Sequence, residues 1–553
     1  MTTAPQRPLP QLTAQNEFFW TAGADGRLRI QHCCACQELI HPPQPVCRYC
    51  RGTEMGVREV SGHATLIGFT LNERFALPGL PPPYVVGQVA LVEDPRIRLT
   101  TTVIDSDPAA LELGMRMEVR FEQHEDVWLP LFRPTAEQPE PAPLPADEIE
   151  PGRFAEHVRP RQTAAKFEDR VALTGIGMSE IGRRLMVPPL RLTVQACERA
   201  VADAGLTMAD IDGISSYPGG GNLGGMGEGG VTALESALGL HPTWYNGGME
   251  TFGPGGSVIA AMLAVAGGLA RHVLCFRTVW EATHNELLRT GKAQPLGGSR
   301  TTSWQLPFGA TSAAHTLAQN AQRHFHRFGT TRETLGWIAL NQRANAELNP
   351  TAVYRDPMTM DDYLSARPVT SPFGLYDCDV PCDAAVAVIV SAVETAPDLA
   401  QPPVFVEAVG TQIIERVDWD QSTLTHEPQV LGQAAHLWTR TELRPADVDV
   451  AELYDGFSFN CLSWIEALGF CGIGEAKEFL DGGKNIARDG LLPLNTHGGQ
   501  LSHGRTHGMG LLHEAVSQLR GAAGPRQVAD ARVAVTSSGG LTPSGVLLLR
   551  SEP

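Results

Sequence analysis

Four cysteines near the N-terminus impose the tightest constraint on how this chain folds. Cys33, Cys36, Cys47 and Cys50 follow the spacing C-x2-C-x10-C-x2-C. Two such pairs, separated by a short hairpin, present four thiolates in a tetrahedron, which is the ligand set of a structural zinc ion. Because no coordination position is left open for water, we expect the zinc to stabilise the fold and to perform no chemistry. Cys34 is the spare cysteine and is not expected to be a ligand.

The composition describes a globular protein of several domains. A chain of 553 residues is too long for one ordinary core, and 42% hydrophobic and 19% charged residues are typical of soluble proteins. The other cysteines are scattered, which favours a reducing compartment. No apolar run can span a bilayer and the start lacks a signal-peptide core, so we expect a cytoplasmic location. The net charge of −18 argues against a nucleic-acid partner, while a local basic pocket for a phosphate remains compatible with it.

Beyond the cysteines, short β-rich runs alternate with turns, a spacing that predicts a small barrel. A run rich in Pro, Ala and Glu follows at 137–145 and predicts a semi-rigid tether between domains. The runs expected to form strands are 64–70, 84–92, 97–104 and 117–121. The expected domains are an N-terminal segment with the zinc site (1–55), the barrel (56–133), a linker (134–165) and a large domain (166–553).

The large domain contains an internal repeat. Residues 209–217, A-D-I-D-G-I-S-S-Y, return as A-D-V-D-V-A-E-L-Y at 446–454. Each copy follows a helical stretch and precedes a glycine-rich turn, an apolar helix and a strand, and the strands are expected at 272–279 and 532–536. The repeat predicts a duplicated, layered α/β domain with its active site between the two halves.

Two glycine-rich turns are the candidate ligand-binding elements of these halves. The segment 494–510 reads L-N-T-H-G-G-Q-L-S-H-G-R-T-H-G-M-G and leads into residues with helical spacing, and 246–257 precedes the apolar helix of the first half. Glycines allow close backbone approach, and a helix N-terminus suits a developing oxyanion. The glycines expected to bind such a group are Gly253, Gly255, Gly499 and Gly539.

The second turn resembles the G-G-x-x-x-x-G-H-P-x-G stretch of thiolases, with Arg505 and Thr506 in place of the histidine and the proline. The form G-G-Q-L-S-x-G-x-x-H-G-M is similar to the sterol-carrier-protein-X-type, lipid-transfer branch, which includes aldolases acting on steroid side-chain acyl-CoAs. This resemblance covers most of 166–553. It implies a thiolase-like α-β-α-β-α domain. The N-terminal part resembles the rubredoxin-like zinc-ribbon and OB-fold proteins that accompany thiolase-like enzymes, where the barrel would bind CoA or serve only for docking.

The resemblance also shows what is missing. A thiolase has its acyl-accepting cysteine within the turn at 246–257 and a second cysteine near 537–540, and this chain has none in either place. We therefore reject a ping-pong thiolase mechanism. The same scaffold can stabilise a CoA-thioester enolate, so retro-aldol cleavage of a β-hydroxyacyl-CoA needs a base but no covalent intermediate.

The resemblance assigns the catalytic groups. Tyr454, in A-E-L-Y-D-G-F-S, stands at the position of the active-site histidine or asparagine of the superfamily, where the aldolase branch has tyrosine. A second tyrosine of that branch would fall at Arg505. We expect Tyr454 to be the general base and Arg505 either to lower its pKa or to bind substrate, with His503 or His507 as alternative proton relays.

The sequence therefore predicts a thiolase-fold carbon–carbon lyase acting on a CoA thioester, with structural zinc. Two rivals remain: a β-ketoacyl-CoA thiolase or acyltransferase with an unusual nucleophile, and a non-catalytic lipid-transfer or scaffold protein. The candidate acyl groups are a steroid side chain and an aromatic acid derivative, and the sequence does not choose between them. A homodimer through 166–553 is expected, and a hydratase is a candidate partner.

Overall fold

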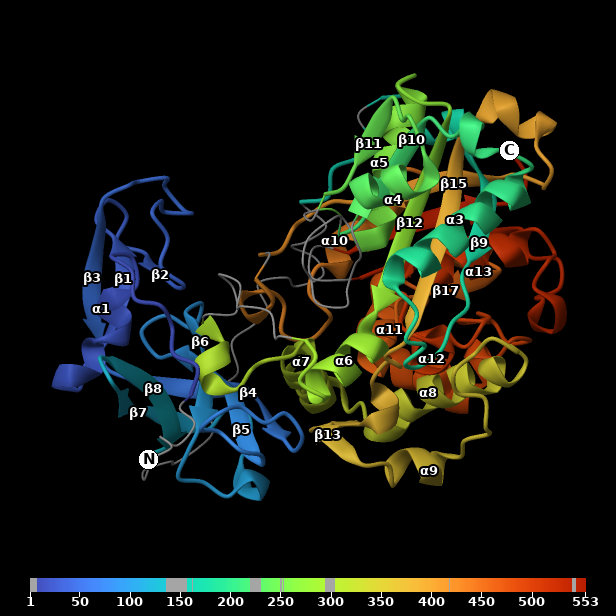
Figure 1. The fold of residues 1–553 in the computed structure, drawn as a ribbon. Coiled ribbons are helices and arrows are strands. Elements are labelled where there is room, and N and C mark those ends of the chain that lie inside the picture. The colour runs from blue at the N-terminus through green and yellow to red at the C-terminus, as the bar shows by residue number, and fades with distance from the viewer. Residues whose placement is uncertain are drawn as a thin grey trace.

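The computed structural model describes residues 7–135, 157–161, 163–218, 230–248, 251, 253–293, 304–416, 418–539 and 544–553. Figure 1 shows a small N-terminal lobe, in blue, beside a larger lobe built from the rest of the chain. The tether expected at 137–145 lies outside the described residues, and so do Gly540 and three positions of the first glycine turn. No helix in the described ranges is long and apolar enough to cross a membrane.

The small lobe begins with a three-stranded antiparallel sheet that carries the cysteines. Strand β1 (Leu28–Cys33) lies between β2 (Leu39–Ile40) and β3 (Met55–Val60). The preceding helix α1 (Glu17–Trp20) anchors this sheet, because the fully buried ring of Trp20 stacks on Trp304 at 4.8 Å. The zinc-ribbon architecture predicted from the cysteine spacing is therefore confirmed.

A five-stranded barrel follows. The predicted strands are confirmed, and pairing of the first with the fourth closes the barrel. A fifth strand, whose sequence contains two prolines, was not predicted; it lies between the third and fourth, where Val119 pairs with Phe132. The strands are β4 (His63–Asn72), β5 (Tyr84–Leu91), β6 (Arg98–Val103), β7 (Arg116–His124) and β8 (Val127–Pro134).

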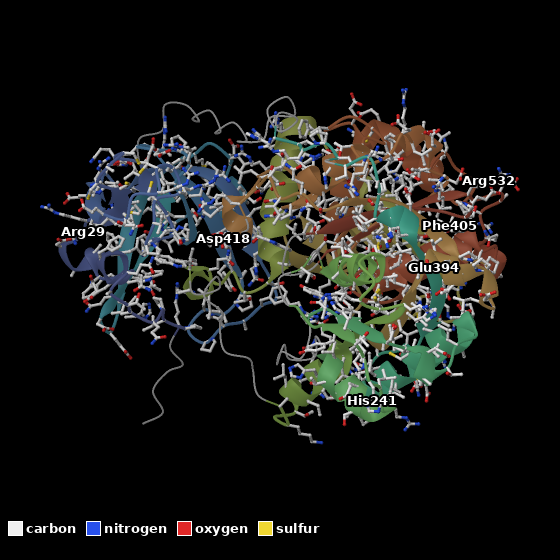
Figure 2. All side chains as sticks on the ribbon, turned by 90° about the horizontal axis from the view of Figure 1, so that it is seen from above. Arg29, His241, Glu394, Phe405, Asp418 and Arg532 are labelled. Atoms are coloured by element: carbon white, nitrogen blue, oxygen red, sulfur yellow. The ribbon has the colours of Figure 1, made fainter. Side chains whose placement is uncertain are left out.

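The barrel is docked on the larger lobe of the same chain. Helix α7 (Ala313–Phe328) packs on β4, and Nη1 of Arg323 donates to the carbonyl of Ile67 at 3.3 Å. Strand β13 (Pro368–Thr370) extends the barrel sheet, since Thr370 pairs with Asn72. Figure 2 shows Asp418 where the two lobes meet. Nearby, Arg98 on the barrel donates to the Ser422 carbonyl.

The larger lobe has two sheet halves joined through a short antiparallel pairing of β9 with β16. The first half has the order β11-β10-β12-β15-β9 and the second has the order β16-β19-β18-β17. The strands are β9 (Val171–Met178), β10 (Gly213–Ser216), β11 (Trp244–Asn246), β12 (His272–Trp280), β15 (Asp383–Ala392), β16 (Val404–Gly410), β17 (Val450–Glu452), β18 (Val533–Ser538) and β19 (Gly545–Arg550).

Helices complete the five layers. Helices α5 (Gly253–Ala266) and α13 (Met509–Leu519) form the central layer, because each contacts strands of both halves. Helix α5 is apolar on nearly all sides, as a helix between two sheets must be. Helix α3 (Pro189–Ala204) packs on the first half, and α10 (Val430–Trp438) packs on the second. The duplicated thiolase-like α-β-α-β-α architecture is confirmed.

The internal repeat takes equivalent places in the two halves. Strand β10 runs parallel to β12, with Gly213 opposite Val273, and β17 runs parallel to β18, with Val450 opposite Ala534. Tyr217 follows β10 and Tyr454 follows β17, so the last residue of each repeat lies at the end of an equivalent strand. The end of β17 is where the candidate active site begins.

Candidate active site

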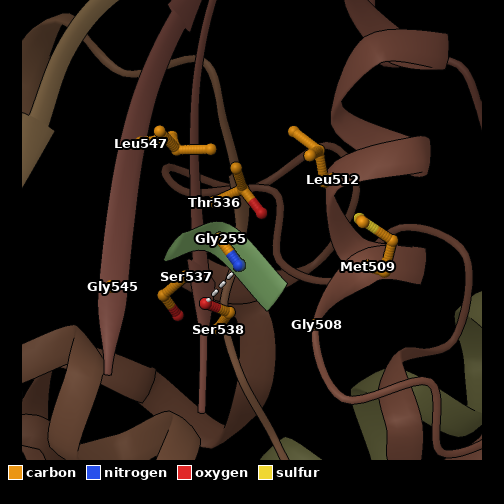
Figure 3. A pocket seen from close by; sticks show the side chains of 9 residues that line it. All are labelled: Gly255, Gly508, Met509, Leu512, Thr536, Ser537, Ser538, Gly545 and Leu547. Carbon is orange, nitrogen blue, oxygen red and sulfur yellow. Dashed lines mark hydrogen bonds between the residues drawn. The ribbon is translucent and has the colours of Figure 1, made fainter. Parts of the chain in front are cut away.

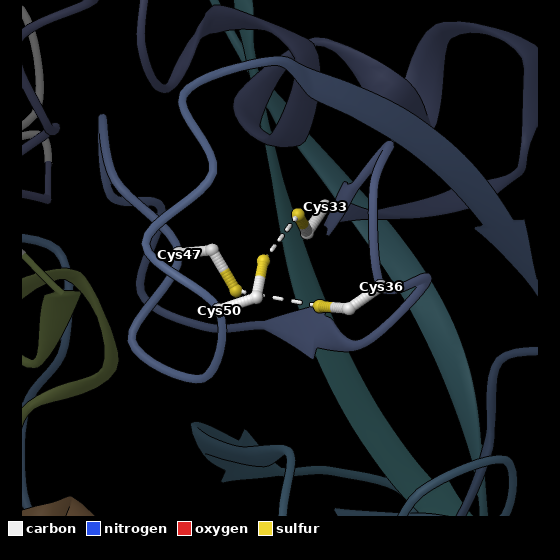
Figure 4. A group of neighbouring side chains, drawn as sticks. All are labelled: Cys33, Cys36, Cys47 and Cys50. Atoms are coloured by element: carbon white, nitrogen blue, oxygen red, sulfur yellow. Dashed lines mark hydrogen bonds between the residues drawn. The ribbon is translucent and has the colours of Figure 1, made fainter.

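The four predicted zinc ligands converge in the N-terminal sheet (Figure 4). The Sγ atoms of Cys33 and Cys50 lie 3.5 Å apart, and those of Cys36 and Cys47 lie 3.6 Å apart. Four thiolates around a tetrahedral zinc ion have neighbouring sulfurs about 3.8 Å apart, so the cluster fits this metal. Cys34 is exposed and lies outside the group.

A second buried group, His324, His426 and Glu466, was not predicted from the sequence. Nε2 of each histidine lies near one oxygen of Glu466, at 3.1 and 2.9 Å. The other ring nitrogens contact Thr330 and Thr425 hydroxyls, so two neutral histidines can donate to the carboxylate while the threonines donate to them. The hydrogen bonds satisfy this triad without a metal.

Tyr454 is held at the end of β17 by its backbone. Its N–H donates to Oγ of Ser537 at 2.8 Å, and Asn495 bonds both backbone groups of the preceding residue, Leu453. Two glycines enclose the ring: an added Cβ would lie 2.7 Å from the ring at Gly539 and 2.9 Å from the hydroxyl at Gly456. The side chain is 8% exposed, and within the described residues its hydroxyl makes no hydrogen bond.

Arg505 lies beside this tyrosine but is engaged by two carboxylates. Its Nε is 3.0 Å from Oδ2 of Asp379, and its Nη1 is 2.9 Å from Oε2 of Glu281 on α6 (Glu281–Arg289). The Arg505 charge acts to lower the pKa of Tyr454, but burial acts more strongly and raises that pKa above its ordinary value. At Tyr454 the effect of burial exceeds that of the Arg505 charge, and the expectation that Arg505 activates the tyrosine stays a prediction.

The two candidate histidines occupy different surroundings. Nε2 of His507 lies 2.9 Å from Nε of Arg505, whereas Nε2 of His503 contacts the Thr351 hydroxyl at 3.2 Å. The His503 ring packs on His497, within the polar network that supports the loop from behind. Burial lowers the pKa of both histidines well below the usual range, and neighbouring cations add to the effect. Both rings are therefore neutral, and only His507 adjoins Arg505.

Three of the four candidate glycines, Gly253, Gly255 and Gly539, lie near the start of the central helices, and Figure 3 shows Gly255 beside Ser538. The Gly255 N–H donates to Oγ of Ser538 at 3.2 Å, and an added Cβ at Gly253 would lie 2.8 Å from the Gly539 carbonyl oxygen. A cavity there is lined by Gly255, Gly508, Met509, Leu512, Thr536, Ser537, Ser538, Gly545 and Leu547. The N-termini of α5 and α13 therefore adjoin one space between the halves, as the repeat predicts.

Gly499 has a different role from the other three. It has φ 57° in a π-helical turn (η12, Gly499–His503), and an added Cβ would lie 1.9 Å from Oδ2 of Asp455. The N–H of Gln500 donates to the other oxygen of that carboxylate at 2.8 Å. Asp455 and Glu452, which accepts from the Thr496 N–H, thus hold the loop in place.

Sequence reasoning missed several charged residues of the site. Asp379, Glu281 and Arg277 come from separate elements of the large domain, and none belongs to the glycine motifs or the repeat. Arg277 donates to the Tyr217 carbonyl at 2.9 Å and lies 3.1 Å from Nδ1 of His507. The sequence does contain a signal for the position of Tyr217, because this residue ends the first copy of the repeat as Tyr454 ends the second.

Three family models match the chain. They are described as the ChsH2 rubredoxin-like zinc ribbon domain (residues 20–56), the ChsH2 C-terminal OB-fold domain (57–122) and the thiolase C-terminal domain-like family (416–549). A solved structure titled Ltp2-ChsH2(DUF35) aldolase is 30% identical, with a TM-score of 0.62, over 69% of this chain and 97% of the other. The fold and site thus define a thiolase-fold lyase acting on a CoA thioester.

Two curated relatives specify the family of the chain more closely. The steroid side-chain-cleaving aldolase of Thermomonospora curvata is 33% identical over 68% of this chain and 97% of the relative. The 17-hydroxy-3-oxo-4-pregnene-20-carboxyl-CoA lyase of Mycobacterium tuberculosis is 34% identical over 68% of this chain and 99% of that enzyme. The chain belongs to this family of thiolase-like aldolases, and it carries the zinc-ribbon and OB-fold domains in the same polypeptide.

Proposed function

We propose that the chain cleaves a β-hydroxyacyl-CoA by a retro-aldol reaction between its two glycine turns. One observation carries the proposal: both turns lack the thiolase cysteine, while Tyr454 lies within reach of the Arg505 charge. Cleavage then requires proton transfer and enolate stabilisation, with no acyl-enzyme. The products are a ketone or aldehyde and a shorter acyl-CoA.

The thioester of the CoA substrate would lie at the cavity beside Ser538. The N-termini of α5 and α13 place the positive ends of two helix dipoles there, which favours the negative charge of an enolate oxygen. Gly253, Gly255 and Gly539 permit close approach of the backbone to this group. Gly499 would contribute indirectly, by fitting the loop onto Asp455.

Tyr454 serves as the acid of the reaction. Because burial raises its pKa, the phenol stays protonated at neutral pH and can donate a proton to the enolate carbon after the bond breaks. Arg505 keeps a positive charge near the substrate, and its side chain is 22% exposed. The neutral histidines do not carry the proton in this scheme.

The substrate follows from the family. The names of the two relatives specify steroid side-chain cleavage and a pregnene-carboxyl-CoA, so a steroid side-chain acyl-CoA is the first substrate to test. An aromatic β-hydroxyacyl-CoA is the second.

The discriminating experiment is incubation with panels of β-hydroxyacyl-CoAs and β-ketoacyl-CoAs, with and without free CoA. Retro-aldol cleavage proceeds on the hydroxyacyl substrates without free CoA. Thiolysis by an unusual nucleophile would consume CoA, and a lipid-transfer or scaffold protein would leave both panels intact.

Zinc and the domain division complete the proposal. A zinc ion bound by the four cysteines would stabilise the N-terminal sheet, and the boundaries at 55, 133 and 165 would separate ribbon, barrel, linker and thiolase-like domain. The contacts of α7 with β4 support docking as the role of the barrel.

Assembly remains part of the proposal. Three exposed apolar side chains surround the edge strand β11: Tyr245 is 68% exposed, Leu269 is 60% exposed and Leu263 is 52% exposed. The Thr243 hydroxyl donates to the Leu269 carbonyl, which places α5 beside this edge. A second copy pairing there would cover the patch and form a homodimer. A monomeric mass at micromolar concentration would contradict this, and a cytoplasmic location and a hydratase partner stay predictions.

A further inference from the structure

Tyr454 is the proposed acid, and the general base of the reaction has not been assigned. The segment around Asp379 lies next to the residues that follow Tyr454. The Asp379 N–H donates to the Gly456 carbonyl at 3.1 Å. The backbones of Cys378 and Phe457 form an isolated antiparallel β-bridge. The segment therefore runs along the residues that directly follow Tyr454.

The backbone of Asp379 lies next to a glycine that adjoins the Tyr454 phenol. Gly456, whose carbonyl accepts from the Asp379 N–H, is the glycine at which an added Cβ would lie 2.9 Å from the Tyr454 hydroxyl. Tyr454 and the Asp379 segment therefore meet at the same glycine.

Arg505 fixes the carboxylate from the other side. Its N–H donates to the Val380 carbonyl at 3.0 Å, and its Nε contacts Oδ2 of Asp379 at 3.0 Å. Within the described part of the chain, Oδ1 of Asp379 makes no hydrogen bond. One oxygen is therefore anchored and the other is available. The Asp379 side chain is 9% exposed and the Arg505 side chain is 22% exposed, so neither member of the pair is completely enclosed.

The charges around Asp379 suit a base that works near neutral pH. Burial raises the pKa of Asp379 to about 7; Arg505 opposes this shift, while Glu281 and Asp455 add to it. Tyr454 faces the same group. Among the described residues, the charged groups that act on Asp379 are the Arg505 guanidinium and the Glu281 and Asp455 carboxylates. The Cys378 and Cys382 thiols also lie nearby.

We propose that Asp379 is the general base that removes the proton from the β-hydroxyl of the substrate, with Tyr454 as the paired acid. The assignment rests on the retro-aldol function proposed above and adds a catalytic residue to it.

The proton and electron balance closes within the site. The Asp379 carboxylate takes the hydroxyl proton, the O–H electron pair forms the carbonyl, and the Cα–Cβ bond electrons become the thioester enolate. Tyr454 then gives its proton to Cα. The resulting phenolate recovers a proton from the Asp379 carboxylic acid, which restores both residues without an external donor.

Glu427 is a second buried acid and provides a matched control. Burial raises its pKa to about 8, and its charge also reaches Tyr454. Its backbone N–H donates to Oγ of Ser463 on α11 (Ser458–Ala467), and the residue is only 1% exposed, so it is more completely enclosed than Asp379.

The first experiment measures steady-state cleavage and its pH dependence in Asp379→Asn. We expect kcat to fall by about 100-fold or more with KM nearly unchanged, because general base catalysis accelerates a reaction by about 10²- to 10⁴-fold. In the wild-type enzyme, kcat/KM should rise with pH through about 7. This rising part of the pH profile, the acid limb, should be absent from the variant. Glu427→Gln should keep both the rate and the limb. An Asp379→Asn enzyme that kept the limb would overturn the assignment.

Chemical rescue separates a base from a residue that only positions Arg505. Asp379→Ala should regain activity with small carboxylates, and the rescued rate should increase with the basicity of the added acid. A rate that is independent of basicity would show that the carboxylate acts only as a counter-ion, which contradicts the proposal.

Glu281→Gln tests the same idea with Asp379 intact. Removing the Glu281 charge lowers the pKa of Asp379, so the acid limb should move to lower pH. A limb that stayed in place would show that another group carries the proton. A wild-type enzyme that cleaved no β-hydroxyacyl-CoA would instead reject the proposed function, which distinguishes that failure from a wrong base.

Discussion

Nδ1 of His507 lies 3.1 Å from Nη2 of Arg277, and Arg505 contacts the opposite nitrogen of the same ring. A neutral imidazole has one N–H and one acceptor, so only one of these contacts can be a hydrogen bond. Two adjacent cations and burial together keep the ring unprotonated. In the proposed scheme His507 therefore lies between two arginines as a neutral ring and carries no catalytic proton.

The first prediction concerns His507→Asn. His507 has φ 55°, which asparagine tolerates better than most residues, so the loop should keep its shape. Turnover should fall by less than about tenfold, because no proton transfer is removed. The measurement is the pH profile of kcat/KM, whose acid limb should keep its position. Loss of that limb would restore His507 as a proton relay.

The second prediction concerns Tyr454→Phe, which removes the acid and leaves the ring in its glycine-lined site. Turnover should fall by about 100-fold or more, while binding of a substrate analogue is kept. Normal cleavage by this variant would exclude Tyr454 from the chemistry.

The third prediction concerns Arg505→Gln. The guanidinium lowers the pKa of Asp379 and of Tyr454, so its loss raises both. Because the base must be ionised, the acid limb of kcat/KM should move to higher pH, opposite to the shift expected for Glu281→Gln. The two pH profiles, measured side by side, test the sign. An increase in KM alone would mean that Arg505 only binds substrate.

Much of the fold was predictable because it depends on local patterns. The cysteine spacing specified the ribbon, and the repeat ending at Tyr217 and Tyr454 specified the duplicated halves. The fifth barrel strand was missed because Pro130 and Pro134 disfavour a strand. Strand β8 accepts them because its pairing with β6 is limited to Phe132.

The candidate site was only partly predictable. Tyr454 and Arg505 belong to motifs, but Asp379 is placed by tertiary contacts with Gly456 and Arg505 that are distant in sequence. The net direction of the Tyr454 pKa shift could not be predicted from the sequence, because burial of the phenol depends on the packing of Gly539 and other distant segments.

The fourth prediction concerns zinc. Cys36→Ser removes one of the four ligands, so the protein should lose zinc and the N-terminal sheet should unfold. Cys34→Ser is the matched control, because Cys34 is exposed and outside the cluster, and it should keep both metal and structure. Metal analysis and circular dichroism of both variants provide the measurement. Retention of zinc by Cys36→Ser would contradict the four-ligand assignment.

The last prediction concerns Glu466, which joins α7, the barrel-docking helix, to the core through its hydrogen bonds with His324 and His426. Burial would raise the pKa of Glu466, but the hydrogen bonds from both histidines outweigh it and lower the pKa to about 2. A depressed carboxyl pKa contributes stability above the unfolded value of about 4.3, and this contribution is lost as pH falls towards 2. Glu466→Gln should lower the free energy of unfolding at pH 7 by about 1–3 kcal/mol, and the difference from wild type should shrink by pH 3. Denaturant unfolding at both pH values measures it, with Glu478→Gln, an exposed carboxylate on α12 (Ala476–Leu480), as the control. An equal loss at pH 7 and pH 3 would show that the ionised carboxylate is not what holds the docking helix.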